Sequence, residues 1–250
     1  MAAQQHIPHD HQPKGPSPLG EKFAFPSDHF PIAANVQLNN HQVTVASWNV
    51  LSSHCLHQIE EREIHVLHGS QVTSEHRIGL LEHQTSPRVR DHVTERDLLV
   101  LAKINELFRN GVSLLSLQEC SPPFCKLLAR PGAFESPNLE RIVSGGGDPA
   151  VAGMIVYDPS ALSTDPKNCF EHPLGGGSRY VLGANFTTPS GERFSFLTTH
   201  LPGRGDLIEI LAELSKVLEN EKLLPMKVLT GDFNRSPSDV LHSLRERDQG

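Results

Sequence analysis

Four short apolar runs of the chain each end in a polar residue that can bind a metal ion or handle a proton. The runs lead into Asn49, Glu119, His200 and Asp232, in this order along the sequence. Each run has the pattern of a strand, and polar residues that follow strands lie on loops that a rigid scaffold holds at one rim of a sheet. The arrangement favours a site built from several strand ends.

The first two strands have the pattern of an antiparallel hairpin. Apolar residues alternate with smaller or polar ones over residues 30–38, and a second alternating segment covers residues 43–49. Asn39-Asn40 between them is a good turn pair, because asparagine tolerates positive φ. The other predicted elements are helices over 95–109, 122–129, 206–221 and 237–247, and strands over 112–118, 152–157, 180–187, 194–199 and 227–230. This order predicts an α/β sandwich, in which helices pack outside two sheets.

Length and composition suit one domain with a polar tail. The chain has 250 residues, of which 37% are hydrophobic and 20% are charged, close to ordinary globular usage. Residues 1–22 contain almost no large apolar side chains and are predicted to be a disordered tail. Residues 23–250 are expected to form a single domain, in which residues 54–94 are a polar, histidine-rich surface insertion.

Charge, cysteine usage and hydropathy argue against several classes of protein. The net charge of −7 argues against a dedicated binder of long nucleic acids, which more often has a basic face. The four cysteines form no Cys-x-x-Cys pair, so zinc is not expected, and scattered cysteines are typical of reduced thiols in a cytoplasmic protein. No apolar run reaches the roughly 18 residues of a membrane span, and no secretory signal is predicted. The sequence predicts no particular oligomeric state.

The residue types at the strand ends are those that phosphate-ester hydrolysis requires. A carboxylate can hold Mg²⁺, which prefers oxygen ligands, and Mn²⁺ is the expected substitute. The ion polarises a phosphoryl oxygen, a second carboxylate orients or activates water, and Asn and His side chains hold the phosphate oxygens. Each of these residues alone is more often an ordinary loop or turn residue, so the prediction depends on their joint occurrence.

The four segments, in this order, resemble successive motifs of the endonuclease/exonuclease/phosphatase superfamily, which has the DNase-I-like fold. The matching segments are SWNVLS, LLSLQEC, FLTTHLPG and VLTGDFNRSP, and the resemblance covers most of residues 43–245. WNVLS, TTHL and GDFNRSPSDVLHSL look most similar to nocturnin and the cytoplasmic poly(A) deadenylases. The resemblance implies a four-layer sandwich, with two mixed sheets face to face between helices. It also implies metal-dependent hydrolysis of a phosphodiester or phosphomonoester.

One motif of the family stands at an unexpected place. The family closes on a Ser-Asp-His motif at its last strand, and none follows the final motif here. Ser27-Asp28-His29 instead precedes the first predicted strand, which continues through a short turn into the strand of Trp48-Asn49. First and last strands are antiparallel neighbours in the resembled fold, so a hairpin could join them, and we interpret the order as a circular permutation. The permutation predicts that His29 lies close to Glu119 and Asp232.

By resemblance, the candidate site residues have separate roles. Glu119 is the expected principal Mg²⁺ ligand, with Asn49 beside it on metal or phosphate and Asp28 supporting the metal site. Asp232 is expected to position or activate water, and His29 to act as general base or as a donor to the phosphate. The residues expected to contact the phosphoryl group or the substrate are His200, Asn234, Arg204 and Tyr157.

Substrate and activity stay open at this level. An RNA 3′ end, a nucleotide, DNA, an inositol phosphate or a phospholipid head group would suit the chemistry. The motif details favour RNA or a nucleotide, whereas the acidic net charge favours a small substrate. The family also has an Asp-containing strand that orients the catalytic His, and no such segment is found here. An incomplete chain, a substitute acid or reduced activity would explain that departure, and the alternative function is a non-catalytic binding module.

Overall fold

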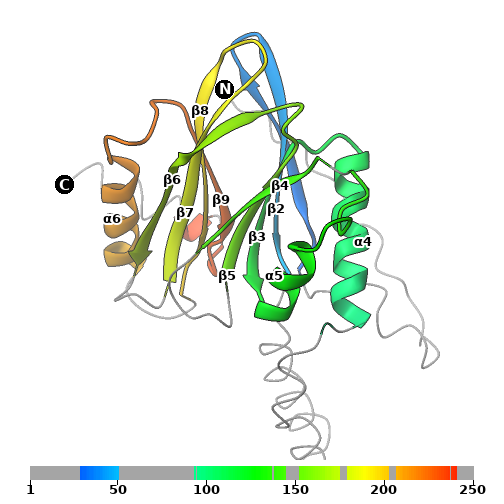
Figure 1. Ribbon diagram of the computed structural model, residues 1–250. Coiled ribbons are helices and arrows are strands. Elements are labelled where there is room, and N and C mark those ends of the chain that lie inside the picture. Colours follow the sequence, from blue (N-terminus) through cyan, green and yellow to red (C-terminus); the bar gives the residue numbers. More distant parts are fainter. Residues whose placement is uncertain are drawn as a thin grey trace, which may run out of the picture.

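The computed structural model describes residues 29–50, 93, 95–136, 138–144, 152–174, 179–202, 207–236 and 238–240. In this part of the chain the strands form two sheets (Figure 1). The first sheet has the order β1-β2-β3-β5-β4, with β1 Ile32–Leu38, β2 His41–Asn49, β3 Leu114–Cys120, β4 Glu140–Val143 and β5 Ala152–Tyr157. The second has the order β6-β7-β8-β9, with β6 Ser163–Leu174, β7 Arg179–Thr187, β8 Arg193–His200 and β9 Lys227–Asp232. The helices are α4 Glu95–Arg109, α5 Pro122–Leu128 and α6 Leu207–Leu218.

Three apolar clusters show how these elements are layered. The first cluster joins the helices α4 and α5 to the first sheet and includes Trp48 and Ile104. The second lies between the two sheets and includes Leu114 and Phe196. The third joins α6 to the second sheet and includes Leu211. The order is therefore helix, sheet, sheet, helix (Figure 1), which confirms the predicted four-layer sandwich.

The predicted hairpin is present. β1 pairs antiparallel with β2, from Ile32 opposite Ser47 to Leu38 opposite His41. Asn39 occupies the turn with a φ of 44°, a left-handed conformation that asparagine adopts more readily than most residues. The first strand begins at Ile32, two residues later than the sequence pattern predicts.

Two pairs of parallel strands supply the strand ends that carry polar residues. β2 runs parallel to β3, and β8 runs parallel to β9. On β8, Phe194 and Phe196 belong to the cluster between the sheets, and Thr198 and His200 follow at the same two-residue spacing. Because side chains in a strand alternate between its faces, the inner face changes from apolar to polar toward the end of β8. The space between the sheets is thus a hydrophobic core at one end and a polar site at the other.

Two strands were not predicted from the sequence. β6 contains Pro166 and Pro173 among polar residues, which is typical of a loop, but proline is tolerated because β6 is an edge strand. Its pairing with β7 is also interrupted between Thr164 and Cys169. β4 is a four-residue edge strand that is largely exposed, so it lacks the apolar alternation that marks a buried strand.

Several sequence predictions lie wholly or mainly outside the described residues. These are the tail at residues 1–22, nearly all of the insertion at 54–94, and the final helix at 237–247, of which the structure describes 238–240 as helical. Asp28 and Arg204 also lie outside the described residues. Among the helices that are described, none is long and apolar enough to cross a membrane.

Candidate active site

Four strand ends meet at the polar end of the space between the sheets. Asn49 is the last residue of β2, and His200 and Asp232 are the last residues of β8 and β9. Glu119 is the last residue but one of β3. The strand register places Asn49 beside Gln118 in one sheet and His200 beside Asp232 in the other. The four residues predicted from the strand ends are therefore brought together.

Asn49 links the two carboxylates of the site. Its Nδ2 donates one hydrogen bond of 2.8 Å to Glu119 Oε1 and another of 2.8 Å to Asp232 Oδ2. An amide nitrogen carries two hydrogens, so both are used. The bond to Glu119 stays within the first sheet, and the bond to Asp232 crosses to the second. Asn49 therefore fixes the position of the two carboxylates relative to each other.

His200 lies against both carboxylates. Its Nε2 is 3.5 Å from Glu119 Oε1 and 3.8 Å from Asp232 Oδ2, and its side chain is 9% exposed. Burial lowers the pKa of His200 below its usual value, although the negative charges of Glu119 and Asp232 act in the opposite direction. The lowered pKa favours the neutral imidazole, in which one ring nitrogen can donate a hydrogen bond and the other can accept one.

Glu119 has an unusual backbone conformation. Its φ is 58°, in the left-handed region, and the pairing of β3 with β5 shifts register between Leu117 and Cys120. A bulge of this kind re-aims a side chain, and a residue such as glutamate is held there only if its surroundings compensate for the strain. Sequence reasoning placed Glu119 just after a strand, and the structure places it at an irregularity within one.

The site has the composition of a divalent cation site. Glu119, His200 and Asp232 each offer a ligand atom, and these three atoms lie within 4.8 Å of one another. Glu119 Oε2 is buried and has no hydrogen-bond partner among the described residues. Burying a carboxylate oxygen without a partner is costly, and a cation would satisfy it. Two carboxylates suit a hard cation such as Mg²⁺ or Mn²⁺.

His29 approaches the site from the N-terminal side of β1. Its Nε2 is 3.9 Å from Asp232 Oδ2, and its side chain is 45% exposed. Its backbone carbonyl accepts a hydrogen bond of 2.9 Å from Trp48 Nε1. A histidine 203 positions before Asp232 in the sequence thus stands beside it in space.

The loop after β9 holds Asp232 in place. The backbone N–H of Asn234 donates to Asp232 Oδ1 at 2.8 Å, and Asn234 Nδ2 donates to the Leu201 carbonyl at 2.8 Å. Gly231 has a φ of 136°, and a Cβ at this position would lie 1.9 Å from the Thr199 carbonyl oxygen. Glycine is therefore required at position 231, where β9 lies opposite Thr199 of β8. The Asn234 amide therefore fixes the loop here, and its expected contact with the phosphoryl group stays a prediction.

A layer of small polar side chains lies beneath the site and was not predicted. Gln118 Nε2 donates to Thr198 Oγ1 at 2.9 Å, and the Thr230 hydroxyl lies 2.9 Å from Ser116 Oγ. Both contacts join one sheet to the other. The available signal was spacing, because Ser47, Thr198 and Thr230 each stand two residues before a strand-end residue of the site and therefore on the same strand face.

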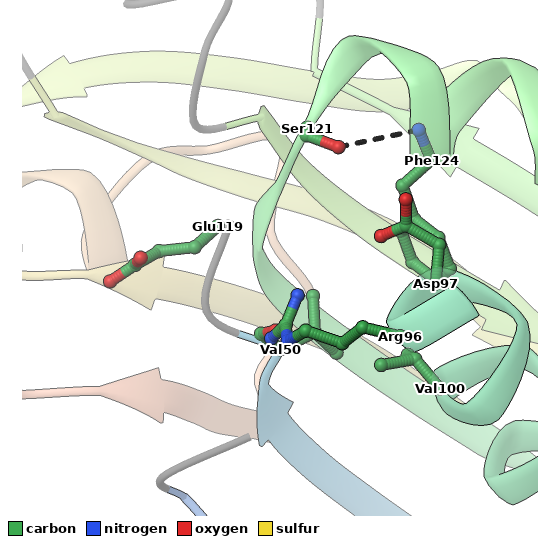
Figure 2. Close-up of a pocket in the computed structure, with 7 residues that line it drawn as sticks. All are labelled: Val50, Arg96, Asp97, Val100, Glu119, Ser121 and Phe124. Atoms are coloured by element: carbon green, nitrogen blue, oxygen red, sulfur yellow. Dashed lines mark hydrogen bonds between the residues drawn. The ribbon is translucent and has the colours of Figure 1, made fainter. Parts of the chain in front are cut away.

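A small hollow adjoins Glu119 on the side of α4 and α5. Its lining residues are Val50, Arg96, Asp97, Val100, Glu119, Ser121 and Phe124, as Figure 2 shows. Arg96 donates a hydrogen bond to the Val50 carbonyl, and the Val50 N–H donates to the Gln118 carbonyl at 3.0 Å. In the same view the Glu119 carboxylate points away from Arg96. The hollow is therefore part of the packing of α4 and α5 against the first sheet, on the side of Glu119 away from its carboxylate.

Tyr157 lies elsewhere. It pairs with Leu114 at the start of β3, whereas Glu119 lies near the end of that strand. Its hydroxyl donates to Glu140, and its ring packs edge-on against Phe186 at 5.2 Å between centroids. The sequence prediction that Tyr157 contacts the substrate does not agree with this position. The apolar pattern of GMIVYDPS gives no information on how β5 is aligned with β3.

Solved structures share this architecture. ANGEL2, a 2′,3′-cyclic phosphatase, matches with a TM-score of 0.54 at 20% sequence identity, over 81% of this chain and 56% of the ANGEL2 chain. ANGEL2 in complex with adenosine-2′,3′-vanadate matches with a TM-score of 0.54 at 19% identity, over 86% of this chain and 60% of that one. The chain has the DNase-I-like fold. The fold implied by the resemblance is thereby confirmed.

The other comparisons do not assign a function to this chain. D. rerio TDP2 in complex with a single-strand DNA product has a TM-score of 0.46 at 19% identity, over 59% of this chain and 57% of that one. The chain spans less than two thirds of the length of these solved chains. No protein-family model matches it, and no curated protein sequence matches it. Function must therefore be argued from the site.

Proposed function

We propose that the chain is a Mg²⁺-dependent phosphoesterase that hydrolyses a phosphodiester or phosphomonoester, with Mn²⁺ as a substitute ion. The observation that carries the proposal is the cluster of Glu119, His200 and Asp232, whose ligand atoms lie within 4.8 Å of one another and whose two carboxylates share the Asn49 amide. A fold shared with a 2′,3′-cyclic phosphatase supports the same chemistry.

Each residue of the cluster would have its own role in hydrolysis. Glu119 would hold the ion, with Asn49 orienting its carboxylate. When bound, Mg²⁺ would polarise a phosphoryl oxygen and offset the charge that develops on it. Asp232 would accept a hydrogen bond from the attacking water and so orient it. His200, neutral because of its burial, would donate a hydrogen bond to a phosphoryl oxygen.

His29 would complete the site as general base or as a donor to the phosphate. Its Nε2 lies 3.9 Å from Asp232 Oδ2, close enough for both groups to contact the same water or phosphate oxygen. We also propose that this histidine belongs to a permuted Ser-Asp-His motif. The antiparallel β1–β2 hairpin and the position of His29 beside Asp232 support that proposal.

The test is phosphate-ester hydrolysis with Mg²⁺, with EDTA, and with the variant Glu119→Gln. The panel would contain oligo(A) RNA, 2′,3′-cyclic nucleotides, NADPH, DNA, inositol phosphates and an aryl phosphodiester. We expect EDTA to abolish activity and Glu119→Gln to lower kcat by roughly 100-fold or more, because removal of one charged ligand weakens both metal binding and charge stabilisation. Glu135→Gln is the matched control. Glu135 is an exposed carboxylate that pairs with Arg109 at the end of α4, whereas Glu119 lies near the start of that helix.

Two outcomes would count against the proposal. Activity that persists in Glu119→Gln would mean that the cluster is not the catalytic centre. If the folded wild type hydrolyses no substrate of the panel, the binding-module function is favoured instead.

A further inference from the structure

Trp48 is the only tryptophan in the chain, and its ring is almost completely buried. It is 1% exposed and packs in the cluster between α4, α5 and the first sheet, with Ile104 and Leu128 among its members. A buried indole N–H needs an acceptor, because leaving such a donor unsatisfied is costly. The acceptor is the backbone carbonyl of His29, at 2.9 Å.

This hydrogen bond holds His29 at the point where the chain leaves the sheet. The first paired residue of β1 is Ile32, so residues 29–31 lie outside the β ladder. Phe30 is 63% exposed and the His29 side chain is 45% exposed, whereas the Trp48 ring that bonds the His29 carbonyl is buried. The contact from Trp48 therefore constrains the backbone from which the His29 imidazole reaches Asp232.

Adjacent residues of β2 thus serve two parts of the site. Side chains of consecutive strand residues point to opposite faces. Trp48 faces the helices and holds His29, whereas Asn49 faces the second sheet and holds Glu119 and Asp232. The distance between the His29 imidazole and the carboxylates depends on both residues of this dipeptide.

We propose that Trp48 is a positioning residue for His29 in the hydrolytic reaction, acting through the His29 carbonyl. The proposal rests on the proposed phosphoesterase function. It assigns Trp48 a part in the reaction through the backbone of His29, although the Trp48 ring packs on the helix side of the first sheet.

The first test compares Trp48→Phe with Ile104→Val. Both remove atoms from the same buried cluster, but only Trp48→Phe removes the donor to His29. We expect Trp48→Phe to lower kcat roughly fivefold, the effect of one net hydrogen bond, with KM within about twofold of wild type. Ile104→Val should leave both constants near wild type. In a His29→Ala background, Trp48→Phe should cause no further loss of kcat, because the group that it positions is gone.

A second measurement does not depend on activity. Amide hydrogen exchange of the segment 29–34, followed by mass spectrometry, should be faster in Trp48→Phe and unchanged in Ile104→Val. If Trp48→Phe does not fold, the single tryptophan can be replaced during expression in a tryptophan auxotroph by an analogue with sulfur in place of the indole N–H, which keeps the shape of the ring.

The outcomes separate the two proposals. Unchanged exchange in the segment, or a loss of kcat that is as large in His29→Ala as in wild type, would overturn the role of Trp48. A wild type that hydrolyses nothing would overturn the phosphoesterase proposal, and the role of Trp48 in the reaction with it. The exchange data would then report only whether Trp48 holds the His29 backbone.

Discussion

Gln118 on β3 donates a hydrogen bond of 2.9 Å to Thr198 on β8, directly joining the two sheets beneath the site. Gln118 is buried, and the residue that follows it is Glu119. Thr198 stands two residues before His200 on the same strand face. The spacing between Glu119 in the first sheet and His200 in the second is therefore supported by a polar contact in the layer below.

Removal of that contact should lower stability. Gln118→Met keeps the approximate volume but leaves the buried Thr198 hydroxyl without this donor, so we expect a loss of about 1–3 kcal/mol in the free energy of unfolding. Urea denaturation measures the loss. Gln37→Met is the control, because Gln37 is exposed, and it should stay within about 0.5 kcal/mol of wild type. Equal losses in the two variants would contradict a structural role for the cross-sheet bond.

Mg²⁺ should stabilise the folded chain. A ligand that binds only the native state at tenfold excess over its Kd adds about 1.4 kcal/mol to the free energy of unfolding. We expect the melting temperature of wild type to rise with MgCl₂ and that of Glu119→Gln to stay constant, with NaCl at equal ionic strength as the reference. A similar rise in both proteins would place the bound ion outside the cluster.

Gly231 should not tolerate alanine. The added Cβ would lie 1.9 Å from the Thr199 carbonyl oxygen, at a φ that side chains rarely adopt. We expect Gly231→Ala to cost more than about 3 kcal/mol or to prevent folding. Gly191→Ala is the matched control, since Gly191 also has a positive φ of 88° but nothing within 4 Å of an added Cβ. It should cost only about 1 kcal/mol.

Alkaline pH should destabilise the fold through Tyr180. This side chain is 6% exposed, and its burial raises the pKa of Tyr180 well above the ordinary value of about 10. The unfolded chain releases the phenolic proton near pH 10 while the folded chain retains it, so stability is complete below pH 10 and falls as pH rises above it. The expected slope from this group is about 1.4 kcal/mol per pH unit.

Urea denaturation between pH 8 and pH 11 measures that slope, with Tyr180→Phe as the comparison. The variant lacks the titrating group, so its stability should fall less steeply above pH 10. Parallel curves for the two proteins would mean that Tyr180 titrates alike in both states.

Elements with a regular pattern of apolar residues could be predicted from the sequence. The helix over 95–109 has the observed bounds, and the hairpin turn lies at Asn39 as expected. The strand ends carrying Asn49, Glu119, His200 and Asp232 were also predicted. Their apolar runs and terminal polar residues are local features, so a single sequence is enough to read them.

Other features depend on how strands align, which one sequence does not encode. Tyr157 was expected near the site, but the register of β5 on β3 puts it at the other end of the sheet. The bulge at Glu119 and the bond from Asn234 to the Leu201 carbonyl arise from contacts between strands and loops that are distant in sequence. β6 was not predicted because it contains prolines, which usually argue against a strand. At the edge of a sheet proline is tolerated.

The contacts that build the site differ widely in the length of chain that they close. Trp48 and His29 are 19 residues apart, whereas Asn49 and Asp232 are 183 residues apart. Closing a long loop costs more entropy than closing a short one, and local contacts form faster. On the refolding pathway we expect His29 to be anchored early and the two carboxylates to meet last, so that the proposed cation site is complete only when β9 has joined β8 and both sheets have formed.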